Sequence, residues 1–455
     1  MAGNPATTVR PGGQTLRRLA SFAVVFAVIA VALVAALAPR LVPGTPAGRD
    51  AGTLAAGVVF AATYLALALG EIPFLAIDRA GVALVGACLM VISGALPLGD
   101  AYKAVDLDTL TLLLGMMIVV ANLRLSGFFA LATAWVMRRA HRPLVLLVAV
   151  VAVAGVFSAF LVNDAICLVL SPLVLDLALV LKRRPTPYLL AVATASNIGS
   201  TATLTGNPQN IMIGSFSRIP YTQFTAALAP VALIGLVLTV ALIALIHRGE
   251  FFAGGPRLQP ARARVRANRF LMARALAATV VMVGLFFAGQ PPAKAAIILG
   301  ALLLLTRRVR SERVYAEIDW SLLLMFAGLF IVVAGAQHAL LTPRVVAAVG
   351  RLHLENVPVL SLVTAVLSNI VSNVPAVLVL KPFVATLPDP TRAWLTVAMA
   401  STLAGNFTVL GSIANLIVVQ RAASRGVTIG FWDYFVIGAP LTLLTIALGT
   451  FWLMR

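Results

Sequence analysis

Residues 193–214, ATASNIGSTATLTGNPQNIMIG, place amide and hydroxyl side chains with Gly and Pro inside an otherwise apolar segment. The windows around this segment are mostly Leu, Val, Ala and Ile. Backbone that leaves helical geometry at membrane depth must be satisfied by protein, water, an ion or a substrate. The composition therefore predicts an unwound stretch within a membrane span, which is the type of segment in which transporters hold their cargo.

The polar landmarks of this segment recur later in the chain, in the same order. GSTATLTGNPQN recurs as AGNFTVLGSIAN at a shift of about 205 residues, and FLVNDAICLVLSP recurs as IVSNVPAVLVLKP at a shift of about 210. An earlier pair is AVDLDTLTLLLGMMIVV at 104–120 and AEIDWSLLLMFAGLFIVV at 316–333. Because basic residues flank the first hairpin-like unit and not the second, we expect opposite topologies. Inverted repeats with interrupted helices predict alternating access around a site near the membrane midplane.

Four polar elements are expected to meet at this site, namely two hairpin tips and two broken spans. Amides exposed at half-helix N-termini favour anions, while free carbonyls together with Asn and Thr oxygens suit Na⁺. Isolated Ser or Thr residues could instead be contacts between packed helices. The candidate substrate- and ion-binding residues are Asn163, Asp164, Asn197, Gly199, Ser200, Thr201, Thr203, Gly206, Asn207, Asn369, Ser372, Asn373, Asn406, Thr408, Gly411 and Ser412.

Asp164 breaks the symmetry of the repeats, because the equivalent position is Val374. An ionisable residue within a membrane span is a functional hypothesis by default. Loss of water around the carboxylate would favour proton binding, whereas a bound cation would favour the charged form. A tip exposed to bulk water is the alternative reading.

The overall composition is that of a polytopic, all-α membrane protein. Hydrophobic residues make up 61% and charged residues 11% of the 455 residues, whereas a soluble domain carries about 25% charge. This excludes a soluble binding module. The net charge of +19 comes from Lys and Arg clustered between apolar runs, the pattern of cytoplasmic loops and not of nucleic-acid binding. The two cysteines and four histidines show no metal-ligand spacing.

About eleven transmembrane helices plus two re-entrant hairpins are predicted, with the N-terminus cytoplasmic and the C-terminus outside, in a cell (inner or plasma) membrane. Whether 143–181 is re-entrant or forms two ordinary spans stays open, because each arm is long enough to cross. The apolar run at 19–38 is read as a retained span, although a cleaved signal is an alternative. The predicted segments are a tail at 1–18, N-terminal spans at 19–97, repeat 1 at 104–246 (tip 163–164, broken helix 186–216), a basic cytoplasmic loop at 247–269, linking spans at 270–306 and repeat 2 at 316–453 (tip 369–373, broken helix 391–424).

Over roughly residues 52–455 these motifs resemble the ion transporter superfamily, the citrate-transporter-like permeases, which includes sodium–dicarboxylate symporters, arsenite permeases and Na⁺/H⁺ antiporters. The resemblance implies that Asn163, Ser372 and Asn373 match the family's hairpin tips, and that 199–207 and 408–412 match the broken-span partners. It also implies a Na⁺ site at Asn163, Gly199 and Asn373. The tips here, Val-Asn-Asp and Ser-Asn-Val, depart from the Ser-Asn-Thr of the symporters and look more like arsenite permeases.

The leading hypothesis is a secondary transporter of a small anion, oxyanion or its neutral acid, with arsenite or antimonite efflux as the most specific candidate. Na⁺-coupled di- or tricarboxylate symport and Na⁺/H⁺ antiport through Asp164 are the alternatives. An intramembrane enzyme is disfavoured, because no Ser–His, Asp–Asp or HExxH constellation occurs. No cofactor is expected beyond H⁺ or Na⁺ as coupling ion. The resemblance allows a homodimer, and ATP coupling would need a separate ATPase subunit, because no nucleotide-binding loop is present.

Overall fold

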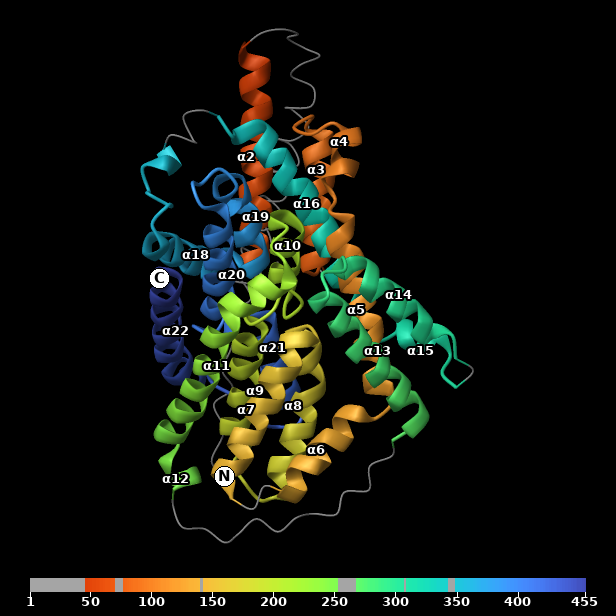
Figure 1. The fold of residues 1–455 in the computed structure, drawn as a ribbon. Helices are drawn as coiled ribbons and strands as arrows, with labels where there is room; N and C mark the ends of the chain where they lie inside the picture. Colours follow the sequence, from red (N-terminus) through yellow and green to blue (C-terminus); the bar gives the residue numbers. More distant parts are fainter. Residues whose placement is uncertain (1–45, 70–76, 140–141, 253–266, 307, 343–347) are drawn as a thin grey trace, which may run out of the picture. The chain divides into compact units, whose positions relative to one another are not determined.

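The computed structural model describes residues 46–69, 77–139, 142–252, 267–306, 308–342 and 348–455, and all regular structure in these ranges is helical. The predicted tail at 1–18, the predicted first span at 19–38 and residues 253–266 of the basic loop lie outside the described residues. The chain forms two compact units (Figure 1).

Unit 1 is small and contains α2 (Pro46–Leu69), α3 (Arg79–Ile92), α4 (Leu98–Ala104) and, except for Trp320, α16 (Trp320–Leu340). Within it α2 packs against α3. Asp78 fixes the start of α3, because its carboxylate accepts a hydrogen bond of 2.8 Å from the Gly81 amide. The later copy of the 104–120 motif therefore lies in unit 1, in α16, whereas the earlier copy, in α5, belongs to unit 2.

Unit 2 contains the remaining helices, which lie in two groups along the chain. The first group is α5 (Leu107–Leu125), α6 (Phe128–Arg139), α7 (Pro143–Phe160), α8 (Asn163–Val180), α9 (Pro185–Ser200), α10 (Pro208–Ser217), α11 (Tyr221–Ile246), α12 (Arg248–Phe251), α13 (Arg269–Phe287), α14 (Pro292–Leu304) and α15 (Ser311–Tyr315). The second group is α18 (Val357–Val371), α19 (Asn373–Val384), α20 (Pro390–Ala404), η1 (Val409–Gly411), α21 (Ile413–Ala423) and α22 (Phe431–Leu453).

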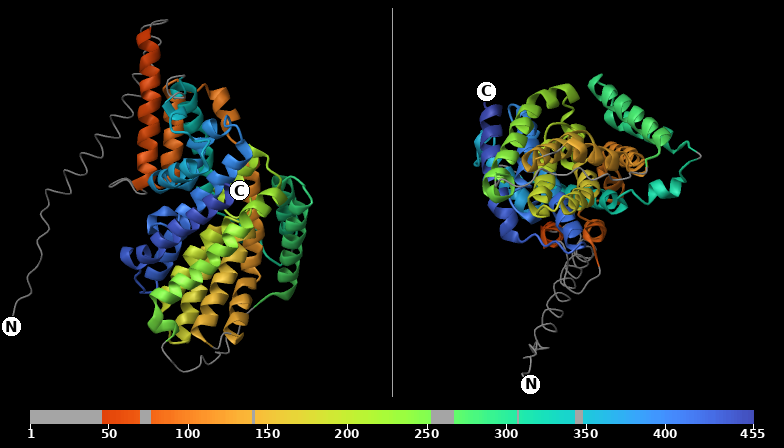
Figure 2. Two further views of the ribbon diagram at one scale, coloured as in Figure 1. Left: turned by 60° about the vertical axis from the view of Figure 1, so that its left-hand side comes forward. Right: turned by 90° about the horizontal axis from the view of Figure 1, so that it is seen from below.

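Helix α9 lies at the centre of unit 2. It packs against α7, α8, α11 and α21, and it is buried along nearly its whole length. Figure 2 shows α7, α8, α9 and α11 side by side. Proline at the first turn of α7, α9 and α10 starts these helices without leaving an unpaired amide. A helix buried on all sides has to satisfy its polar side chains internally, so the Asn and Ser residues of α9 must find protein partners.

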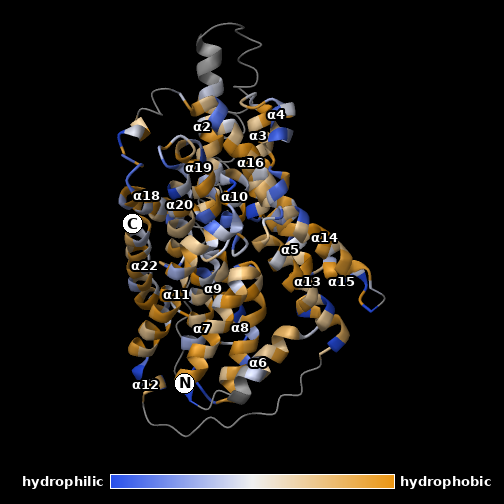
Figure 3. Cartoon of the chain, in the orientation of Figure 1, coloured by the Kyte–Doolittle hydropathy of each residue, from blue (hydrophilic) through white to orange (hydrophobic). Residues whose placement is uncertain are grey.

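Seven helices within the described ranges are long and apolar enough to cross a bilayer, and six shorter apolar helices accompany them. Large apolar side chains point away from the protein on the long helices: Val237 on α11 is 62% exposed and Val280 on α13 is 70% exposed. Figure 3 shows the hydrophobic colouring along both helices. Such surfaces are unfavourable in water and suit lipid, so the chain is an all-helical, polytopic membrane protein.

Two bends between helices and two interruptions in helices create the polar centre of unit 2. The bend between α7 and α8 passes through Val162 and the bend between α18 and α19 through Ser372, with φ values of 22° and 77°. These two non-glycine residues in an unfavourable region are 210 residues apart, the shift found in the sequence. Residues 201–207 separate α9 from α10, and residues 405–412, which include the short η1, separate α20 from α21.

Candidate functional site

Asn197, near the end of α9, is the centre of a buried amide network. Its amide nitrogen donates to Asn406 Oδ1 at 2.9 Å and to Asn415 Oδ1 at 3.0 Å. Its own oxygen accepts from Asn163 Nδ2 at 3.0 Å and from Ser412 Oγ at 3.1 Å. These four bonds use both amide hydrogens of Asn197 and both lone pairs of its oxygen. One side chain with 1% exposure thus joins the first hairpin tip to both ends of the second interruption.

Bonds between the two interruptions are reciprocal. Ser412 donates to Asn197, and Asn207 Nδ2 donates at 3.0 Å to the hydroxyl of Thr402. These two contacts are equivalent in the repeats, because Asn207 lies 205 residues before Ser412 and Thr402 lies 205 residues after Asn197. A contact from one copy to the other that is matched by its exchanged equivalent is the signature of two-fold symmetry. The sequence repeat therefore has a structural counterpart at the point where the two copies touch.

Each interruption is also folded in the same way internally. Asn210 Nδ2 donates to the carbonyl oxygens of Ser200 and Thr203 at 3.1 and 3.0 Å. Asn415, at the same shift of 205, donates to the carbonyl oxygens of Gly405 and Thr408 at 2.7 and 3.2 Å. These bonds pair the carbonyls that the helix end leaves free.

A glycine is required in each interruption, because the chain crosses its own helix end there. A Cβ at Gly206 would lie 2.1 Å from the Ser200 carbonyl oxygen. A Cβ at the equivalent Gly411 would lie 2.9 Å from the Gly405 carbonyl oxygen. Only a residue without a side chain permits such an approach.

Three amide oxygens at the hairpin tips have no hydrogen-bond partner in the protein. They are Asn163 Oδ1, Asn369 Oδ1 and Asn373 Oδ1. The side chains of Asn163 and Asn373, which are equivalent in the repeats, are 3% and 8% exposed. A Cβ at Gly411 would lie 3.2 Å from Asn369 Oδ1, and one at Gly405 would lie 3.1 Å from Asn373 Nδ2, so the second tip lies against the network, as the first does through Asn163. The centre therefore presents acceptors that await a donor or a cation.

Charged side chains are scarce here. Among the described residues, no lysine, arginine or histidine side chain hydrogen-bonds to the amides of this network. Asp164 lies in the first turn of α8, next to Asn163, and is half-buried. Lys381, on α19, lies with its ammonium 3.8 Å from the centre of the Phe216 ring, away from these bonds. The network is neutral, with one carboxylate beside it.

The other predicted residues support the network or its backbone. Thr201 donates to the Asn197 carbonyl oxygen at 3.3 Å, and Thr203 donates to the Ala159 carbonyl oxygen. Ser200 Oγ accepts from Asn207 Nδ2 at 3.0 Å. A Cβ at Gly199 would lie 2.2 Å from the Gly155 carbonyl oxygen, so Gly199 lets α9 approach α7 closely. Ser372 forms the second bend, and Thr408 contributes its carbonyl oxygen.

Further residues outside the predicted set complete the network. Ser196 bridges Ser158, at 2.8 Å, and the Asn163 carbonyl oxygen, at 3.2 Å. Thr402 accepts from Asn207 and Gln209, and Tyr434 reaches Asn406 Oδ1 at 3.5 Å. The repeat shift could have identified Asn415 as the mate of Asn210 and Thr402 as the mate of Asn197. Tyr434 on α22 lies outside the repeated motifs, and no local signal marks it.

Comparison with known proteins gives consistent matches over most of the chain. Residues 63–404 match the family profile described as CitMHS, citrate transporter. The chain is 30% identical to the silicon efflux transporter LSI3 of Oryza sativa subsp. japonica, covering 86% of this chain and 96% of that protein. It is 24% identical to a Dictyostelium discoideum protein provisionally named transporter arsB, covering 82% and 87%. It is 28% identical to the inner membrane protein YbiR of Escherichia coli (strain K12), covering 76% and 87%.

Among solved structures, the crystal structure of the Alcanivorax borkumensis YdaH transporter is similar, with a TM-score of 0.51 and 17% sequence identity over 89% of this chain and 97% of that one. At this identity the match concerns the fold alone.

Proposed function

Because the chain belongs to the citrate transporter (CitMHS) family and is therefore a secondary transporter and not an enzyme, we propose that it carries a small neutral oxyacid, of the silicic or arsenous acid type, at the amide network. The observation that carries this proposal is the set of unpaired oxygens of Asn163, Asn369 and Asn373. The cargo is expected to exchange between the two sides by alternating access.

The chemistry of these oxygens favours a donor of hydrogen bonds. An unpaired buried acceptor raises the free energy of the folded state by about 1–3 kcal/mol, and a hydroxyl group or a cation would remove that penalty. Each hydroxyl of a neutral oxyacid can donate to one of these amide oxygens. A carboxylate has only acceptors, so it would leave them unpaired and add repulsion from Asp164.

Charge balance also argues against citrate as cargo. A tricarboxylate in a site of low dielectric constant needs cationic partners, and the network as described has none within hydrogen-bonding distance. The relatives named for silicon efflux and as an arsB-type transporter support an oxyacid. Na⁺-coupled di- or tricarboxylate symport is the second candidate. It is favoured by the family's name and requires Na⁺ to bind at the unpaired oxygens first.

The two repeats are expected to have opposite orientations in the membrane, forming about eleven spans with two re-entrant hairpins. The reciprocal bonds between Asn197 and Ser412 and between Thr402 and Asn207 support this arrangement. From the positions of the basic clusters we expect the N-terminus inside and the C-terminus outside. The coupling ion is H⁺ or Na⁺, with Asp164 as the proton acceptor. For Na⁺, the oxygens of Asn163 and Asn373 are better candidates than Gly199, whose carbonyl already accepts from the Ala202 amide at 3.1 Å.

Proteoliposome transport tests the proposal. Purified protein is assayed with silicic acid, arsenite and citrate in parallel, under an imposed proton gradient and under an imposed Na⁺ gradient. We expect transport of at least one neutral oxyacid and its loss in Asn163→Leu and Asn373→Leu. The matched control is Asn122→Leu, a buried asparagine of α5 whose single bond goes to the Ile118 carbonyl oxygen. Citrate transport without any oxyacid transport would refute the proposed substrate class.

A further inference from the structure

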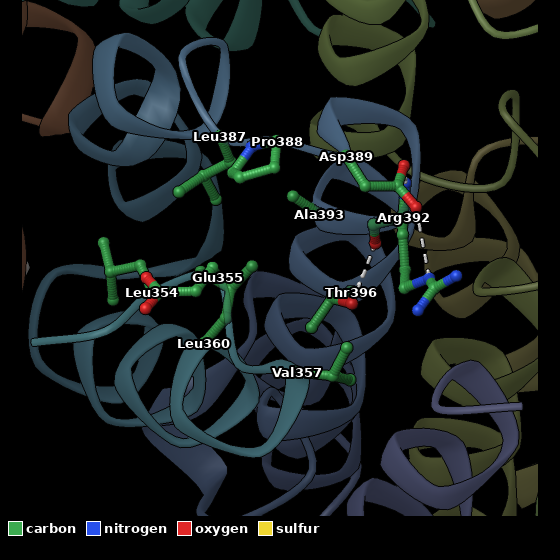
Figure 4. Close-up of a pocket in the computed structure, with 10 residues that line it drawn as sticks. All are labelled: Leu354, Glu355, Val357, Leu360, Leu387, Pro388, Asp389, Arg392, Ala393 and Thr396. Atoms are coloured by element: carbon green, nitrogen blue, oxygen red, sulfur yellow. Dashed lines mark hydrogen bonds and ion pairs between the residues drawn. The ribbon is translucent and has the colours of Figure 1, made fainter.

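A small pocket lies in unit 2 where α18 and α20 begin. Its volume is about 90 Å³, and Val357 and Leu360 of α18 line it together with Ala393 and Thr396 of α20. Figure 4 shows these residues below the turn that carries Leu387 and Pro388. Nothing in the proposed transport site accounts for this pocket.

One face of α18 runs from this pocket to the amide network. Val357, Ser361, Thr364 and Ser368 are spaced by four, three and four residues, so they lie on a single face of α18, and Ser372 follows at the bend just past its end. Apart from the valine at the pocket, every member carries a hydroxyl. From Val357 to the last residue of α18 a helix rises by about 21 Å. The side chains of Ser361, Thr364 and Ser368 are 2%, 0% and 1% exposed, so the face is enclosed by other helices.

The central hydroxyls of this face have no partner in the protein. Thr364 Oγ1 and Ser368 Oγ make no hydrogen bond. Buried Ser and Thr hydroxyls in helices commonly donate to the carbonyl four residues earlier, as Thr194, Thr239 and Thr445 do here. Unpaired polar groups in a buried position are normally satisfied by internal water. Two such groups one turn apart, continued by the unpaired oxygens of Asn369 and Asn373, indicate a hydrated line.

The other repeat lacks this feature. At the shift of 210 residues, Ser361 and Thr364 correspond to Val151 and Ala154 of α7. Ser368 corresponds to Ser158, whose hydroxyl is bonded to Ser196 Oγ at 2.8 Å. The polar face is therefore not a requirement of the hairpin fold, and it connects the centre with one end of unit 2 only.

A carboxylate at the pocket and neutral oxygen atoms along the face suit a cation, and they oppose the partial positive charge of the N-termini of α18 and α20 at the pocket. Arg392 at the pocket is paired with Asp389 at 3.3 Å, while Glu355 contacts His353 at 2.9 Å. Hydrogen bonds from its own backbone amide and from His353 lower the pKa of Glu355, so this carboxylate stays charged at neutral pH. Helix α18 contains no lysine or arginine, and its unpaired atoms are hydroxyl and amide oxygens.

We propose that this face of α18 holds a file of water along which a small monovalent cation, H⁺ or Na⁺, moves between the pocket and the oxygens of Asn369 and Asn373. The cation would thus have an entry separate from the broken helices. That the cation drives transport rests on the function proposed above, whereas the hydration of the face does not.

Thiol accessibility to Ag⁺ tests the hydration directly. In a background with Cys88→Ala and Cys167→Ala, the variants Thr364→Cys and Ser368→Cys place a thiol on the face. Val366→Cys and Ile370→Cys are matched controls on the opposite side of the same helix, where the native side chains are 51% and 60% exposed and we expect them to face lipid. The readout is protection of the thiol by Ag⁺ from later maleimide labelling in denaturing detergent, so it requires no transport activity.

We expect Ag⁺ to react about a hundredfold faster at 364 and 368 than at 366 and 370, the ratio that follows from excluding an ion from hydrocarbon. Equal rates on the two faces would overturn the proposal, whatever the substrate proves to be. Slower reaction when Na⁺ is added identifies Na⁺ as an occupant, and an unchanged rate with Na⁺ identifies a path for protons. Adding Ag⁺ to one side at a time shows to which side the pocket opens.

Thr364→Val and Ser368→Ala then test the link to transport. Both remove a hydroxyl without removing a protein hydrogen bond, so the variants should fold. We expect gradient-driven transport to fall at least about tenfold, a change of about 1.4 kcal/mol, while substrate binding at the amide network is retained. Wild-type rates in both variants would contradict a role of the path in coupling. Loss of substrate binding together with normal Ag⁺ accessibility would instead count against the proposed function.

Discussion

Replacing Asn197 with leucine should destabilise the protein far more than replacing any other single buried asparagine outside the network. Leucine has a similar size, so the change removes four hydrogen bonds with little change in packing. Asn163 Nδ2, Asn415 Oδ1 and Ser412 Oγ lose the partner that they have here, whereas Asn406 Oδ1 keeps the Tyr434 hydroxyl at 3.5 Å. At about 1–3 kcal/mol for each stranded group, the loss is about 3–9 kcal/mol.

The matched control is again Asn122→Leu. Asn122 is 1% exposed, as Asn197 is, but it makes one hydrogen bond of 2.8 Å to a backbone carbonyl oxygen. Its replacement should lower stability by only about 0.5–1.5 kcal/mol. The assay is thermal denaturation of both purified variants in one detergent, followed by size-exclusion chromatography of the protein that remains dispersed.

A double-mutant cycle adds a test of the proposed connection. Ser412→Ala removes one of the bonds to Asn197, so its effect in the Asn197→Leu background should be smaller than in the wild type. An Asn197→Leu protein as stable as Asn122→Leu, or full additivity with Ser412→Ala, would refute the assignment of Asn197 as the centre of the network.

Two further predictions concern the backbone and pH. Gly206→Ala should lower stability by about 1–3 kcal/mol or more, because its Cβ would lie 2.1 Å from the Ser200 carbonyl oxygen. Gly214→Ala should be tolerated, because its Cβ would lie 3.1 Å from the flexible end of the Leu204 side chain. Equal denaturation temperatures of the two variants would contradict this prediction. Burial lowers the pKa of His247, at the end of α11, below 6.5, with Asp433 opposing and Arg184 assisting the shift. The unfolded chain therefore binds this proton first, so stability should fall as the pH decreases from about 6.5 toward the lowered pKa and stay level above 6.5. The pH dependence of the denaturation temperature should be weaker in His247→Gln, and an unchanged pH dependence would show that another group is responsible.

The sequence was sufficient to locate the polar elements because glycine, proline and asparagine are rare in apolar runs. It located Asn163 and Asn373 as equivalent residues, and the structure leaves an unpaired oxygen on each. It also associated Asn197, Asn406 and Ser412, which are hydrogen-bonded here. The periodicity of a chain with 61% hydrophobic residues says little about which helices touch, because buried and lipid-facing positions are both apolar.

Residues outside those motifs could not be found in this way. Tyr434 reaches the network from α22, which carries none of the Asn and Gly landmarks of the two repeats. Thr364 and Ser368 look like ordinary helix-packing residues in the sequence, and only their lack of partners distinguishes them. Asp164 is prominent in the sequence as a charge in a span. Among the described residues it makes no hydrogen bond to the network, and its role stays a prediction.

The reciprocal bonds between the interruptions have a mechanical consequence. Six side-chain hydrogen bonds join the α9–α10 segment to the α20–α21 segment: Asn197 to Asn406 and Asn415, Ser412 to Asn197, Asn207 and Gln209 to Thr402, and Asn406 to the Thr194 carbonyl oxygen. Separating the segments would break these six hydrogen bonds and so cost about 3–9 kcal/mol of free energy. A rocking motion that opens a gap between them is therefore unfavourable. The two segments should travel together as one rigid piece, and the cargo should move with that piece.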